Sequence, residues 1–196
     1  GEIAMTDTTA TPTAAPARYT AAQRWLHWLV ALLVLGNLAG GATLWFFGFE
    51  GLRDSFGMAA TNAVYTAHKT SGVLVLAFVL VRLGVRGRAG APPRPASLSP
   101  LVWSLAVANH AALYVLLVAM SVLGWAATAA GGFPVQLFAW NLPGLVPENE
   151  ALSERLFALH GIVGLLIAVL VTIHIAAALR HRFVLRDGVF HRIGLP

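Results

Sequence analysis

Histidine is the residue of this sequence best suited to chemistry, because five of the seven histidines lie in or at the edge of long apolar runs. An ionisable side chain in lipid is costly and usually functional. Imidazole suits haem iron, zinc or copper. The absence of cysteine excludes iron–sulfur clusters, covalent haem attachment through a CxxCH motif, and disulfides. The five are His27, His68, His110, His160 and His174.

Two of these histidines, His160 and His174, share one uncharged run and are 14 residues apart. In an α-helix, 14 residues fall about 40° short of four full turns, so both rings would project from nearly the same face. The rise of about 1.5 Å per residue separates them by roughly 21 Å, which puts one near each surface of a bilayer. The spacing suits two metal centres that share a helix. The alternative is a pair of core histidines bonded to neighbouring backbone.

The composition predicts the helices that must position these rings. The chain is 58% hydrophobic and 11% charged, whereas about a quarter of the residues of a soluble protein are charged. We expect an all-α integral membrane protein, a four-helix bundle that forms one domain over residues 18–192. Residues 1–17 are expected to be a disordered tail that begins with a cloning remnant. The expected spans are residues 25–47, 64–85, 101–128 and 157–180.

The distribution of basic residues predicts the orientation. Ten arginines lie in or beside the N-terminal tail, the connection between the second and third spans, and the C-terminal tail, whereas the other side has only Arg53, Lys69 and Arg155. Because basic residues favour the cytoplasmic side, we expect both termini in the cytoplasm. The net charge of +5 is therefore interpreted as a topology signal, and no nucleic-acid partner is expected.

Depth in this topology sorts the histidines into pairs. His68 and His160 each begin an inward span, so both lie near the outer surface. His27 begins an outward span and His174 ends an inward one, so both lie near the inner surface. His110 competes with His27 as the inner ligand. We prefer His27 and interpret His110 as a hydrogen-bonding residue near the inner cofactor or a quinone head group.

Haem fits these pairs better than zinc does. Bis-imidazole ligation in a helix bundle needs one histidine on each of two facing helices. A zinc site would normally need three or four protein ligands, and the outer layer offers only two histidines.

Several short segments together resemble the bacterial cytochrome b561 family of four-helix dihaem membrane proteins. They are RYTAAQRWLHW at 18–28, His68, ANHAALY at 108–114, GFPV and LP within 132–143, and LHG and TIHIAAALRHRF within 159–183. The resemblance covers residues 18–192. It implies two non-covalent haems b, held by His27 and His174 at the inner site and by His68 and His160 at the outer site, in the bacterial inner membrane.

The resemblance also implies a function. Family members pass electrons between the periplasmic side and membrane quinone, and some are similar to superoxide oxidase, an oxidoreductase that takes electrons from superoxide and reduces ubiquinone. Lys69 beside an outer ligand could attract superoxide; the alternative is an interface lysine that reaches water. His181 matches a family histidine near the inner quinone region. With Arg24, His110 and Arg180 it is a candidate for binding haem propionates or a quinone carbonyl.

Two other functions stay open. The RYxxxQRxxHW opening also occurs in membrane cytochrome b subunits that link a hydrogenase- or dehydrogenase-type partner to quinone, although no extra docking domain is evident here. A histidine-based metal-ion transporter is the third possibility. Transport pathways usually contain intramembrane carboxylates, whereas all eight acidic residues here lie in loops or tails.

Overall fold

The computed structural model describes residues 17–195, and this part of the chain is mostly helical. Three helices are long and apolar enough to cross a membrane: α1 (Ala21–Ala89), α2 (Pro100–Ala130) and α3 (Glu150–Leu179), which a π-helix (Arg180–Leu185) extends. Two short strands, β1 (Val135–Leu137) and β2 (Trp140–Leu142), pair as an antiparallel hairpin between α2 and α3. A 3₁₀-helix (Phe190–Arg192) follows near the C-terminus. The tail predicted to be disordered lies outside the described residues, except for its last residue.

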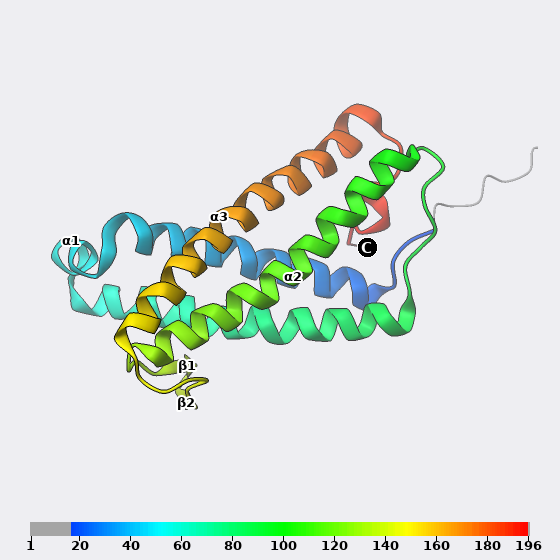
Figure 1. Ribbon diagram of the computed structural model, residues 1–196. Helices are drawn as coiled ribbons and strands as arrows, with labels where there is room; N and C mark the ends of the chain where they lie inside the picture. Colours follow the sequence, from blue (N-terminus) through cyan, green and yellow to red (C-terminus); the bar gives the residue numbers. More distant parts are fainter. Residues whose placement is uncertain (1–16, 196) are drawn as a thin grey trace, which may run out of the picture.

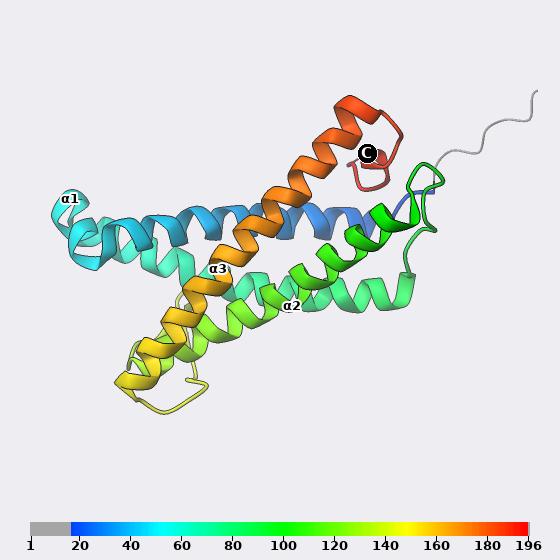
Figure 2. The same cartoon turned by 45° about the horizontal axis from the view of Figure 1, so that its top comes forward.

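Helix α1 doubles back on itself, as Figures 1 and 2 both show. Its helical geometry is broken at Gly48 and Gly57, where φ is 64° and 81°. Glycine adopts positive φ without steric cost. The first arm (residues 21–47) and the second arm (residues 58–89) therefore contain the first two predicted spans. The prediction counted four separate helices, whereas the backbone forms three long ones because residues 49–56 remain helical between the two glycines.

Polar caps set where two of the helices begin. Thr20 and Gln23 form the predicted capping box at the start of α1, with the Gln23 N–H donating to Thr20 Oγ1 and the Thr20 N–H donating to Gln23 Oε1. Helix α3 begins at Glu150, seven residues before the predicted start of the span, because Asn149 Oδ1 accepts from the Leu152 N–H. The acidic side chain of Glu150 in the first turn also favours this start.

Both arms of α1 pack with α2 and α3 around one small core. Helices α2 and α3 lie side by side and cross the hairpin of α1 (Figure 1). Much of the remaining apolar surface faces outward, as expected of helices in lipid. The core consists of Val30 and Val34 from the first arm, Val75 and Val79 from the second arm, and Ile167 from α3, with Tyr114 of α2 packed against them.

The connecting segments gather at opposite ends of the bundle. The turn of α1 and the β1–β2 hairpin lie at one end, whereas residues 17–20, residues 90–99 and the C-terminal residues lie at the other (Figure 1). The hairpin packs against the second arm, where Thr70 Oγ1 donates to Gln136 O and Lys69 Nζ donates to Pro134 O. We call residues 180–195 the C-terminal hook, because they turn back toward the bundle after α3.

Candidate metal centres

Two imidazole rings meet where the second arm of α1 approaches the start of α3. The ring centres of His68 and His160 are 6.2 Å apart, with an angle of 80° between the ring planes. The two residues belong to different helices and are 92 positions apart in the sequence, so only the tertiary structure brings them together.

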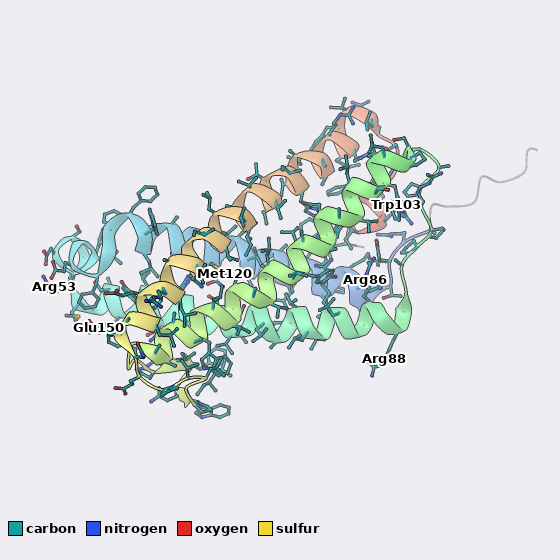
Figure 3. The ribbon with its side chains drawn as sticks, viewed as in Figure 1. Arg53, Arg86, Arg88, Trp103, Met120 and Glu150 are labelled. Carbon is teal, nitrogen blue, oxygen red and sulfur yellow. The ribbon has the colours of Figure 1, made fainter. Side chains whose placement is uncertain are left out.

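A glycine on α2 gives His160 its orientation. His160 Nδ1 lies 3.1 Å from the carbonyl oxygen of Met120, a residue at the middle of α2 in Figure 3. A carbonyl only accepts, so Nδ1 carries the proton and Nε2 keeps a free lone pair. A Cβ at position 124 would lie 2.8 Å from His160 Cε1, so Gly124 provides the space in which the ring sits. This hydrogen bond leaves His160 in the tautomer that a metal ligand needs.

The first arm of α1 surrounds the ring of His68. A Cβ at Gly40 or Gly41 would lie 3.5 or 3.3 Å from ring atoms of His68. The amide end of Asn37 lies 3.1 Å from His68 Nδ1, and the same distance from the hydroxyl of Ser71. The first arm thus fixes a histidine that the second arm carries.

Three imidazoles cluster farther along α3. The ring centre of His174 is 6.1 Å from that of His27 on the first arm and 5.1 Å from that of His110 on α2. His110 Nδ1 donates to Ala106 O at 2.6 Å, within its own helix. The structure therefore brings His27 and His174 together, and it also places the competing His110 against the same ring.

The ring separations fit bis-imidazole ligation of a metal. A metal–imidazole bond of about 2 Å, with roughly 1 Å from each nitrogen to its ring centre, puts the centres of two opposed ligands about 6 Å apart. The His68–His160 and His27–His174 pairs match this value, whereas the His110–His174 pair is about 1 Å too close. Within residues 17–195 no three His, Asp or Glu side chains converge so that they could together hold one metal ion, although His27 and His110 both lie against His174.

Unpartnered polar atoms mark the His27 end. Buried side-chain atoms without a hydrogen-bond partner are rare in folded proteins, and each calls for an explanation. Within residues 17–195 the buried atoms of this kind are Arg24 Nε, His27 Nδ1 and Asn109 Oδ1. All three lie on or beside the turns that carry His27 and His110. These residues fit a polar or propionate-bearing group at this end of the bundle.

Comparison with known proteins shows the family. A sequence model of prokaryotic cytochrome b561 matches residues 18–194, nearly the whole described chain. The chain belongs to the prokaryotic cytochrome b561 family. It is 30% identical to cytochrome b561 homolog 2 of Escherichia coli over 91% of this chain and 92% of that protein. It is 26% identical to the probable superoxide oxidase CybB of Yersinia pestis, over 90% and 95% of the two chains, and 28% identical to cytochrome b562 of Cereibacter sphaeroides, over 91% and 96%.

Membership of the cytochrome b561 family establishes the general role. The chain is a bacterial membrane electron-transfer protein, and proteins of its family bind haem b. The haem expected from the histidine pairs therefore agrees with the family. The two imidazole pairs, with ring centres 6.2 and 6.1 Å apart, are the candidate haem ligands of this cytochrome b561.

Lys69, the candidate for attracting an anion, lies next to His68 of the His68–His160 pair. Its ammonium group donates to Pro134 O at 2.9 Å, so at least one of its three N–H groups ties the loop after α2 to α1. A structural contact thus accompanies the charge near the proposed outer haem of this cytochrome b561.

Two of the three basic candidates at the other end, Arg24 and His181, have partners of their own. Arg24 Nη1 donates to Tyr19 O at 2.8 Å. Arg180 is exposed in the π-helix. His181 Nδ1 lies 2.7 Å from Asp187 Oδ2, with only about a tenth of either side chain exposed.

The contacts of Asp187 lower the pKa of its carboxyl group. Burial by itself raises its pKa, but hydrogen bonds from the Val189 N–H and from His181, together with the charge of His181, hold the pKa below the usual 3.8. The carboxylate therefore stays ionised and anchors the C-terminal hook.

Four residues near the rings were not predicted as site residues. Asn37 and Gly41 approach His68, and Gly124 approaches His160. The guanidinium of Arg82 lies 5.4 Å from the ring centre of Tyr114, which packs against the small core between the arms of α1, α2 and α3. The sequence holds a signal for two of them, because a charge (Arg82) or an amide (Asn37) inside an apolar run is costly. Nothing in the sequence distinguishes Gly124 from a glycine that only packs.

Proposed function

We propose that this cytochrome b561 passes electrons from superoxide on the periplasmic side to ubiquinone in the inner membrane through two haems b. One observation carries the proposal. Helix α3 contributes one histidine to each of two imidazole pairs, and the ring centres are 6.2 Å apart in one pair and 6.1 Å apart in the other. His68 and His160 would hold the outer haem, and His27 and His174 the inner one. When bound, each haem supplies an iron atom that accepts and releases one electron at a time.

The overall reaction balances with these two substrates. Each superoxide ion loses one electron and becomes O₂. Ubiquinone gains two electrons and two protons and becomes ubiquinol, so two superoxide ions are consumed per quinone. The similarity to a probable superoxide oxidase supports this donor.

The chain's own residues act at the two ends. At the outer end, Gly124 and Met120 orient His160, Asn37 and Gly41 enclose His68, and Lys69 presents a positive charge to an approaching anion.

At the proposed inner end, Arg24 Nε and His27 Nδ1 are buried without a hydrogen-bond partner within residues 17–195, and the ring centre of His110 lies 5.1 Å from that of His174. We propose that Arg24, Arg82, His110, Arg180 and His181 serve the haem propionates and the quinone carbonyl there. Four membrane spans with both termini in the cytoplasm would place His160 toward the periplasm and His174 toward the cytoplasm. The ten basic residues in or beside the termini and the 86–100 connection support this orientation.

Rapid mixing of the oxidised protein with superoxide tests the proposal, with haem absorbance as the readout. We expect superoxide to reduce the haem of the wild type and added ubiquinone to reoxidise it. His160→Ala should lose the outer haem and rapid reduction by superoxide. His174→Ala should keep an outer haem that superoxide reduces and ubiquinone does not reoxidise.

Two results would overturn the proposal. The first is haem reduction no faster than the uncatalysed dismutation of superoxide allows. The second is a wild type with a single haem per chain in the reduced-minus-oxidised spectrum and the haem assay. A superoxide-inert protein that co-purifies with a redox subunit would instead point to the hydrogenase-type alternative.

A further inference from the structure

The C-terminal hook encloses a pocket of about 290 Å³, and the electron-transfer proposal does not use the two arginines that line it. Residues of the hook line this pocket. The hook lies where α3 and its π-helix extension end, at the same end of the bundle as residues 17–20 (Figures 1 and 2). Its lining includes two arginines, two histidines and two phenylalanines: Arg182, Arg186, His181, His191, Phe183 and Phe190.

The backbone that forms this pocket is held in place. The chain reverses at Arg186, which has φ 52° and ψ 33°, a left-handed conformation that costs energy for a residue other than glycine. The returning segment is tied to the bundle, because Arg18 Nη2 donates to Gly194 O at 2.8 Å and Trp28 Nε1 donates to Ile193 O at 3.0 Å. Arg192 is buried and donates to Pro93 O at 2.7 Å. Hydrogen bonds to the rest of the bundle therefore hold the backbone around the pocket in place.

The carboxylate of the hook does not neutralise the two arginines of the pocket. Both oxygens of Asp187 are engaged, Oδ2 with His181 and Oδ1 with the Val189 N–H. Within residues 17–195, neither Arg182 nor Arg186 forms an ion pair with a carboxylate. Two guanidinium groups on one small pocket favour an anion between them.

The hydrogen bonds of the lining leave donors available for that anion. Arg182 Nη1 lies 2.8 Å from His191 Nε2. Because a guanidinium only donates, His191 Nε2 must accept, so its proton is on Nδ1 and a ring N–H remains available. Arg186 uses only its Nε–H, which donates to Phe183 O, and both of its terminal nitrogens are unused within residues 17–195.

The surroundings of the pocket identify the kind of anion. Directly beside the two arginines, the side chains of Phe183 and Val184 are 64% and 72% exposed. Exposed apolar side chains at the end of a membrane helix suit acyl chains, and basic pockets at this level suit lipid head groups. We propose that this pocket binds the phosphate group of an anionic glycerophospholipid. The phosphate would bind at Arg182 and Arg186, two residues that the electron-transfer proposal does not use.

Lipid retention by the full-length haem-containing protein in neutral detergent tests the proposal. The probes are phosphatidylglycerol, phosphatidylcholine with the same acyl chains, and inorganic phosphate at the same concentration. Native mass spectrometry counts bound lipid, and tryptophan fluorescence gives the thermal midpoint. We expect several-fold more phosphatidylglycerol than phosphatidylcholine to be retained, with a higher midpoint only in phosphatidylglycerol.

Three variants make the test specific. Arg182→Gln and Arg186→Gly should each lose the preference for phosphatidylglycerol. Glycine suits the positive φ at position 186, so Arg186→Gly should fold at least as well as the wild type while binding less anionic lipid. Arg88→Gln removes the same charge from a side chain that points away from the bundle in Figure 3, and it should keep the preference.

Two outcomes would overturn the assignment. If Arg182→Gln and Arg186→Gly both retain the wild-type preference, the pocket is not the site. If inorganic phosphate raises the thermal midpoint as much as phosphatidylglycerol does, the pocket takes a free phosphate and not a lipid.

Discussion

At the scale of single residues, glycines and hydrogen bonds decide how each imidazole points. His160 reaches Met120 O only because position 124 has no side chain. His68 lies between Gly41 and the amide of Asn37. In both cases a segment other than the one that carries the histidine sets the direction of the ring: α2 for His160 and the first arm of α1 for His68.

Gly124→Ala tests this control at the proposed outer site. The added Cβ would lie 2.8 Å from His160 Cε1, so the ring must move and its alignment with His68 is lost. We expect the haem assay to fall from two haems per chain toward one. Gly36→Ala is the matched control, because a Cβ there meets no atom within 4 Å. Two intact haems in Gly124→Ala would show that the ring tolerates the displacement.

The choice between His27 and His110 is a second prediction at this scale. The 6.1 Å separation from His174 suits His27, and the 5.1 Å separation of His110 is too short for opposed ligands. His27→Ala should therefore lose one haem, whereas His110→Ala should keep both. The haem assay and the reduced spectrum of each variant measure this. One haem in His110→Ala and two in His27→Ala would reverse the assignment.

At the scale of elements, polar contacts fasten the short segments to the long helices. The β1–β2 hairpin is held through Thr70, which is nearly buried and donates to Gln136 O at 3.0 Å. Thr70→Val should leave that carbonyl unpaired, at a cost of about 1–3 kcal/mol. We expect faster amide hydrogen exchange in residues 133–142. Thr172→Val, which removes a bond within α3 only, should leave exchange there unchanged.

The C-terminal hook has a contact that depends on pH. Asp187 has a pKa below 3.8 in the folded state, so the unfolded chain binds more protons between the two values. The stabilisation is thus complete above about pH 4 and is lost as the pH falls through the folded value. Asp187→Asn should destabilise the hook by roughly 1.5–3 kcal/mol near neutral pH.

Thermal midpoints at pH 7 and at pH 3 measure this effect. The difference between wild type and Asp187→Asn should be large at pH 7 and should shrink at pH 3. The exposed Asp54, which pairs with its neighbour Arg53, provides the control, and Asp54→Asn should change neither midpoint. A difference that is equal at both pH values would contradict the role given to the carboxylate.

At the scale of the whole molecule, one end of the bundle has the turn of α1 and the other has residues 17–20 and the C-terminal hook (Figure 1). The chain has no cysteine, so a single introduced cysteine is the only thiol in the chain that a labelling reagent can reach, and its reaction shows on which side of the membrane that position lies. Ser55→Cys lies in the turn of α1 and Ser97→Cys in the basic connection, and both positions are exposed.

A membrane-impermeant maleimide applied to spheroplasts tests the proposed topology. Ser55→Cys should react in intact spheroplasts, whereas Ser97→Cys should react only after lysis, because basic segments stay in the cytoplasm. The opposite labelling pattern would reverse the orientation assigned to the protein in the membrane, so that the outer and inner sites would exchange.

The sequence by itself determined the class of protein, the family and the residues to test. Long uncharged runs require helices in lipid, and costly histidines within them indicate a function. The 14-residue interval between His160 and His174 is local, so helix geometry alone predicted that both would face one side. The capping box at Thr20 was predictable for the same reason, because its bonds span three residues.

Only the tertiary structure decided which partners each ring meets. The contacts of Gly124 with His160 and of Asn37 with His68 join residues from different segments. The unbroken course of α1 and the pocket of the C-terminal hook were likewise visible only in the folded chain. Helix periodicity describes which residues share a face of one helix, but how the faces of separate helices meet depends on side-chain packing. Residues such as Arg18 and Gly194, 176 positions apart, become neighbours only when the whole chain has folded.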